Sequence, residues 1–105
     1  MIPSKSMTSL ILGQKLPNAP ANLTASNVTD TTADITWDAV DYEAGIEQYE
    51  IYRDGTMVDT RVGTSFADSG LTADTTYVYQ VIAVGSNGLK SELSEELTVT
   101  TVPAV

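Results

Sequence analysis

The 105-residue sequence contains no cysteine and no histidine. Without cysteine, no disulfide stabilises the fold, and the thiol count says nothing about the cellular compartment. Without histidine, the chain lacks the usual general base, the usual zinc ligand and the usual pH switch. A serine triad is excluded because no histidine can activate a serine. We therefore expect a protein that is not an enzyme, with no catalytic residue, no cofactor and no metal.

Basic side chains are also scarce. Five Lys and Arg stand against 14 Asp and Glu, which gives a net charge of −9. Residues 1–16 carry Lys5 and Lys15 and no acid, for a charge of +2, whereas residues 17–105 carry all 14 acids and three basic side chains, for −11. An acidic body repels phosphate and anionic lipid, so we expect neither nucleic acid nor a membrane surface as a partner.

Long apolar runs are missing from the sequence. The cluster Leu10-Ile11-Leu12 is too short to span a bilayer or to form the core of a secretion signal, so no membrane insertion is expected. Residues 1–16 show no other periodicity and are predicted to form an N-terminal arm. The arm is interpreted either as a remnant or tail of a preceding domain, or as a flexible segment that docks on a partner through Leu10, Ile11 and Leu12.

Paired prolines at Pro17 and Pro20 indicate the start of a domain over residues 17–102, which leaves a C-terminal tail at 103–105. Within the domain, alternating apolar and polar residues between turn residues predict seven strands. The strands are expected near 21–27, from 33 to 37, from 46 to the turn at 54–55, and at 56–61, 65–68, 75–84 and 92–101. This spacing is typical of an all-β, immunoglobulin-like sandwich of two antiparallel sheets.

The apolar positions of these strands define an expected core. Its members are Leu23, Ile35, Trp37, Tyr49, Ile51, Leu71, Tyr77, Tyr79, Val81, Leu97 and Val99, with Leu93 as a candidate first member of the last stripe. Tyr77 follows Leu71 and Thr75 at the spacing of a tyrosine corner, in which a buried phenol bonds to backbone upstream of it.

Together with Trp37 and the segment Tyr49-Glu-Ile-Tyr-Arg-Asp-Gly55, this corner resembles a fibronectin type III domain over roughly residues 18–101. The 52–56 hairpin and the short 85–88 loop are similar to bacterial and phage members, as in modular secreted carbohydrate-active enzymes and virion proteins. The resemblance implies a spacer, adhesion or surface-interaction module. It also implies an extracellular or cell-surface location within a larger protein, or a place on a virion, with neighbouring domains or other proteins of the assembly as partners.

Two tyrosines fall outside the expected core. Tyr42 lies in the loop before residue 46, and Tyr52 lies on the outward face of its strand. Because carbohydrate modules stack exposed aromatics on sugar rings, the alternative function is a carbohydrate-binding module that contacts cell-surface polysaccharide weakly through both tyrosines.

Two further patterns favour structural interpretations. The acids Asp38, Asp41, Glu43 and Glu47 cluster around one loop, but they lack the alternating spacing of a calcium loop and are interpreted as a solvated rim. Arg53-Asp54-Gly55 contains the residues of an integrin-binding tripeptide in another order, and its Asp-Gly pair predicts a tight hairpin.

Overall fold

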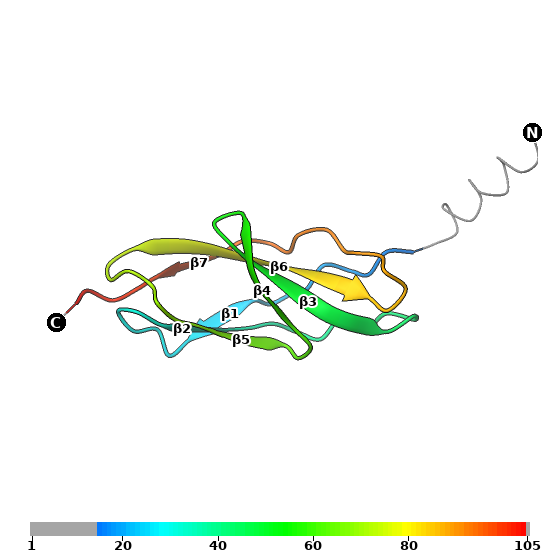
Figure 1. The fold of residues 1–105 in the computed structure, drawn as a ribbon, viewed down its shortest axis with the longest axis horizontal. Coiled ribbons are helices and arrows are strands. Elements are labelled where there is room, and N and C mark those ends of the chain that lie inside the picture. Colours follow the sequence, from blue (N-terminus) through cyan, green and yellow to red (C-terminus); the bar gives the residue numbers. More distant parts are fainter. Residues whose placement is uncertain (1–14, 105) are drawn as a thin grey trace, which may run out of the picture.

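The computed structural model describes residues 15–104 and contains seven strands (Figure 1). They are β1 (Thr24–Ser26), β2 (Ala33–Thr36), β3 (Ile46–Arg53), β4 (Thr56–Arg61), β5 (Ser65–Asp68), β6 (Thr76–Gly85) and β7 (Leu97–Thr100). One sheet has the order β1-β2-β5 and the other the order β4-β3-β6-β7, and every pairing is antiparallel. The prediction of a seven-stranded, two-sheet sandwich is confirmed.

The core lies between the two sheets. Of the expected members, Ile35, Trp37, Tyr49, Ile51, Leu71, Tyr79, Val81 and Val99 are buried, and Ala33, Phe66 and Ala83 join them. The other expected members, Leu23, Tyr77 and Leu97, are partly buried and pack against this cluster. The rings of Trp37 and Tyr49 meet edge to face at 5.5 Å between centroids, which is a favoured arrangement of aromatic quadrupoles.

The tyrosine corner forms as its spacing predicts. The backbone N–H of Thr72 donates to the hydroxyl of Tyr77 at 2.8 Å, which ties the chain before β6 to the strand itself. The ring of Tyr77, the second residue of β6, is only half-buried, however, and the guanidinium of Arg53 lies 5.8 Å from its centroid.

The turn between β3 and β4 has the geometry that its two residues predict. Asp54 and Gly55 have φ values of 54° and 85°, and two positive values in succession are the requirement of a type I′ hairpin. Asp54 is also joined to the neighbouring strand: its N–H donates to the carbonyl of Val78 at 2.7 Å, and its carboxylate accepts the N–H of Val78 at 2.9 Å.

Two predicted strands are shorter than expected. The first begins at Thr24 rather than at 21, because Asn22 has a φ of 60°, which interrupts an extended chain. The last begins at Leu97 rather than at 92, and Leu93 is 46% exposed, so its assignment to the inward stripe is wrong.

Serine side chains replace the missing part of the last strand. Ser91 donates its N–H to the carbonyl of Ala83 at 2.8 Å, and its hydroxyl accepts the N–H of the same residue at 2.8 Å. Ser94 repeats this arrangement with Val81, at 3.0 and 2.9 Å. The two buried serines, three residues apart, thus satisfy the backbone of β6 without a regular strand, and this spacing turns Leu93 outward.

Candidate functional site

The first candidate site is the pole of the sandwich where the described chain begins. Tyr42, in the β2–β3 loop, donates its hydroxyl to the carbonyl of Lys15. The side-chain amide of Asn87, in the β6–β7 connection, donates to the same hydroxyl at 3.1 Å. Tyr42 is therefore half-buried, and its hydroxyl already has partners within the chain.

A hollow of about 350 Å³ adjoins these residues. Its lining consists of Lys15, Leu16, Asn18, Asp41, Tyr42, Glu43, Ala44 and Asn87. Leu16 is 48% exposed, and Asp41 and Glu43 are exposed as well. This pole therefore presents a small hollow with apolar and acidic side chains, beside the point where the chain enters the domain.

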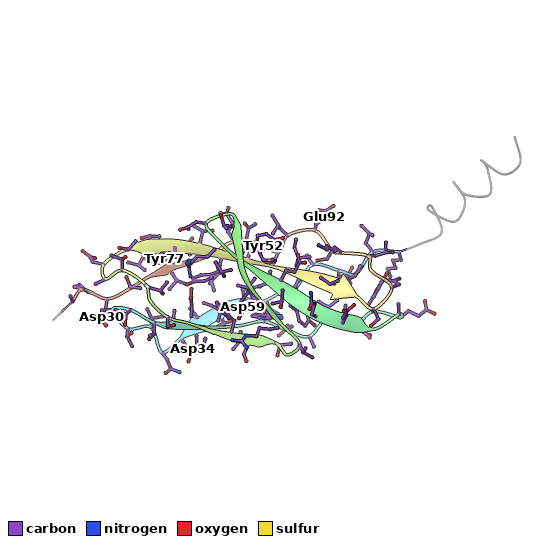
Figure 2. The ribbon with its side chains drawn as sticks, in the orientation of Figure 1. Asp30, Asp34, Tyr52, Asp59, Tyr77 and Glu92 are labelled. Atoms are coloured by element: carbon purple, nitrogen blue, oxygen red, sulfur yellow. The ribbon has the colours of Figure 1, made fainter. Side chains whose placement is uncertain are left out.

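The second candidate site is the outer face of the four-stranded sheet around Tyr52 (Figure 2). Its hydroxyl donates to Glu50 at 3.1 Å, and the ammonium of Lys90 lies 3.0 Å from the other oxygen of that carboxylate. Burial first, and then the hydrogen bond to Glu50, raise the pKa of Tyr52, while the hydrogen bond to Glu50 raises the pKa of Lys90. Met57, 48% exposed, lies opposite Tyr52 on β4.

The two tyrosines of the carbohydrate hypothesis do not share a platform. Tyr42 lies in the loop before β3, whereas Tyr52 lies near the far end of that strand. Ile46 and Tyr52 alone are separated by about 20 Å at roughly 3.3 Å per residue. A single sugar ring cannot stack on both aromatic rings.

A third cluster, which the sequence did not reveal, lies inside the sandwich. Asp68 on β5 is 7% exposed and accepts hydrogen bonds from the hydroxyl of Tyr79 at 2.6 Å, from Arg53 at 2.7 Å and from the N–H of Ser69 at 2.9 Å. Burial and the bond to Asp68 raise the pKa of Tyr79, and the bond to Asp68 raises the pKa of Arg53. The cluster joins the two sheets. The one signal in the sequence is the position of Asp68 two residues after the apolar Phe66.

Asp38 of the acidic loop and the side chains of Arg53 and Asp54 form hydrogen bonds within the domain. Asp38 accepts a hydrogen bond from the side chain of Asn22 at 2.6 Å. Within residues 15–104, no group of three or more acidic side chains is arranged to hold a metal ion. Arg53 is paired with Asp68 at 2.7 Å, and the carboxylate of Asp54 accepts the N–H of Val78, so both side chains of this tripeptide have partners within the domain.

Leu10, Ile11 and Leu12 lie outside the described residues. Across the described part of the chain, from 15 to 104, there is no helix of the length and apolarity needed to cross a membrane.

Comparison with known proteins decides the family. The fibronectin type III domain matches residues 18–100. The chain belongs to the fibronectin type III family. Chitinase 63 of Streptomyces plicatus is 39% identical over 93 residues, which cover 89% of this chain and 15% of that protein. Exoglucanase B of Cellulomonas fimi is 45% identical over 85 residues, which cover 81% of this chain and 8% of that protein.

The structure of chitinase ChiA74 from Bacillus thuringiensis superposes with a TM-score of 0.76 at 25% identity, and the match covers 93% of this chain and 16% of that one. This fibronectin type III chain thus spans well under a fifth of each of these larger enzymes. The similarity relates it to a small part of a multidomain protein.

Proposed function

We propose that this fibronectin type III domain is a non-catalytic spacer and surface-interaction module of a larger extracellular bacterial protein that degrades a polysaccharide. The observation that carries the proposal is the position of the chain ends. The segment that leads into β1 lies at one end of the sandwich, and the C-terminal end lies at the other (Figure 1). A domain built in this way holds its N-terminal and C-terminal neighbours apart.

The chemistry of the interior supports a structural role. Asp68, the buried carboxylate, already accepts three hydrogen bonds from the domain itself and joins the two sheets. A carboxylate with these fixed partners serves packing rather than proton transfer to a substrate. The names of the similar proteins, chitinases and an exoglucanase, support the polysaccharide setting.

The spacer role can be tested in a hybrid enzyme. Residues 15–104 would replace the segment of Streptomyces plicatus chitinase 63 to which they align. We expect hydrolysis of insoluble chitin to be retained, whereas a flexible Gly-Ser linker of the same number of residues should lower it without changing hydrolysis of a soluble oligosaccharide. Equal activity of the linker and domain hybrids on insoluble chitin would contradict the proposal.

Carbohydrate binding is the second candidate, and the exposure of Met57 beside the half-buried Tyr52 favours it. Mixing the isolated domain with insoluble chitin or cellulose and measuring depletion from solution tests it. Depletion that is lost in Tyr52→Ala and kept in Tyr42→Phe would establish a one-ring site on the outer face. No depletion would leave the spacer role alone.

We also propose that residues 1–16 act as a docking arm when the module belongs to an assembly, whether that assembly is an adhesive surface protein or a virion. The arm carries +2 against an acidic body of −11, and Leu10, Ile11 and Leu12 supply its apolar surface. A neighbour with an apolar groove flanked by carboxylates fits this chemistry.

A further inference from the structure

We propose that Tyr42 and Asn87 form a latch that fixes the direction in which the polypeptide enters the sandwich. The inference deepens the spacer function proposed above, because a spacer transmits orientation only if its junctions are held. The latch residues are Tyr42 and Asn87, with the carbonyl of Lys15 as the group they hold and Gly85 as the surface beneath them.

The segment that leads into β1 is anchored in two stages. Pro17 and Pro20 are buried, the carbonyl of Ala21 accepts the N–H of Asp38 at 3.0 Å, and the side chain of Asn22 bonds to the same aspartate at 2.6 Å. These contacts hold the chain from Pro17 onward. Upstream of Pro17, the hydrogen bond from Tyr42 to the carbonyl of Lys15 is the contact that continues the anchoring.

The hydroxyl of Tyr42 uses both of its hydrogen-bonding capacities. It donates to Lys15 and accepts from the side-chain amide of Asn87. The amide is itself oriented, because its oxygen accepts the N–H of Leu89 at 3.2 Å. Because this amide donates to the oxygen of Tyr42, the single O–H of Tyr42 is left to donate to the carbonyl of Lys15.

The ring of Tyr42 has a space made for it on β6. A methyl group at Gly85 would lie 2.6 Å from Cε2 of Tyr42 and 2.7 Å from Oδ1 of Asn87, which is closer than atoms that are not bonded approach one another. Glycine is therefore required at this buried position by the two latch side chains. The loop that carries Tyr42 is also fixed, since Gly45 donates to the carbonyl of Tyr42 and accepts from the N–H of Ser86, each at 2.8 Å.

The consequence is a junction that differs from a flexible linker. A Gly- and Ser-rich connection lets its ends separate by about 5–6 Å times the square root of its length and sets no direction. Here Tyr42, in the loop before β3, bonds to the backbone ahead of the first strand, and Asn87, in the turn after β6, holds the hydroxyl of Tyr42. The carbonyl of Lys15 is therefore held at a fixed place on this pole.

Backbone amide relaxation by NMR on the full chain tests the latch. We expect order parameters of about 0.85 at Lys15 and Leu16 in the wild type, falling below about 0.6 in Tyr42→Phe, which keeps the ring and removes the hydroxyl. Tyr52→Phe is the matched control, because it removes a phenol hydroxyl from the outer face of the sheet and should leave both values unchanged. Gly85→Ala, which displaces the ring while keeping the hydroxyl, should reproduce the fall.

Two results would overturn the proposal. The first is order parameters below about 0.6 at Lys15 and Leu16 in the wild type. The second is order parameters at these residues that are the same in Tyr42→Phe as in Tyr52→Phe. The outcome is separable from the spacer function. If Lys15 is mobile in the wild-type domain but the hybrid chitinase keeps its activity on insoluble chitin, the latch proposal is wrong and the spacer proposal is unaffected.

Discussion

At the scale of single residues, two tyrosines of β6 have different tasks. Tyr77 accepts a backbone N–H at the corner, and Tyr79 donates to the buried carboxylate of Asp68. Both phenols occupy the inward face of one strand, yet one satisfies the backbone and the other a charge. Replacing each by phenylalanine removes one oxygen and isolates these roles.

The first prediction compares Tyr77→Phe with Tyr52→Phe. Tyr77→Phe leaves the N–H of Thr72 without its partner, and we expect a loss of about 1 kcal/mol in the free energy of unfolding, at the lower end of the usual range because Thr72 is exposed to water. Tyr52→Phe should cost less, because Glu50 keeps its ion pair with Lys90. Urea denaturation measures both, and equal losses would show that the corner contributes nothing particular.

The second prediction concerns alkaline pH. Burial, followed by the bond to Asp68, raises the pKa of Tyr79 above its ordinary value of 10. Because the folded state holds this proton more tightly than the unfolded state, the contribution is complete below about pH 10 and is lost as the pH rises further. The urea midpoint should therefore be level from about pH 7 to 9 and fall above about pH 10.

Tyr79→Phe supplies the control for this titration. The variant should be less stable at neutral pH, since Asp68 loses one of its three donors, but its alkaline fall should be shallower than that of the wild type. An alkaline fall of the same size in both proteins would assign the effect to other groups.

At the scale of elements, the sequence predicts what local signals specify. Asp54-Gly55 predicts its hairpin because two adjacent residues must take positive φ, and Leu71 to Tyr77 predicts the corner because all its parts lie within seven positions. The pattern over 92–96 predicts a strand that does not form. Serine hydroxyls replace ladder hydrogen bonds to β6 in this region, and apolar periodicity carries no information about such side-chain bonds.

The third prediction belongs to this segment. Ser94→Ala removes the acceptor of the N–H of Val81, which is fully buried, and we expect a loss of about 1–3 kcal/mol in the free energy of unfolding. Leu93→Ala, on the exposed side of the same segment, should change it by less than about 0.5 kcal/mol. Chemical denaturation of the two variants side by side tests this, and the reverse order would restore the inward assignment of Leu93.

At the scale of the whole molecule, the sites that sequence alone could not supply are those assembled from distant segments. The latch joins Lys15, Tyr42 and Asn87, and the inner cluster joins Arg53, Asp68 and Tyr79. In both, each residue has an ordinary sequence context, and only the folded chain brings the partners together. Sequence alone therefore offers Tyr42 as a partner contact, whereas the structure bonds it to its own chain.

The last prediction concerns the arm. Deleting residues 1–14, which keeps Lys15 and its bond to Tyr42, removes none of the hydrogen bonds described for residues 15–104. The thermal midpoint of the isolated domain should therefore change little. If Leu10, Ile11 and Leu12 dock on a neighbour, their burial on its surface offsets the cost of ordering the arm, about 1–2 kcal/mol per residue. The deletion removes these contacts and should therefore abolish co-purification with that neighbour. Replacing these three residues by serine should have the same effect on assembly, since it keeps the length and charge of the arm and removes its apolar surface. A midpoint that falls by several degrees in the isolated truncated domain would instead mean that the arm packs on its own sandwich.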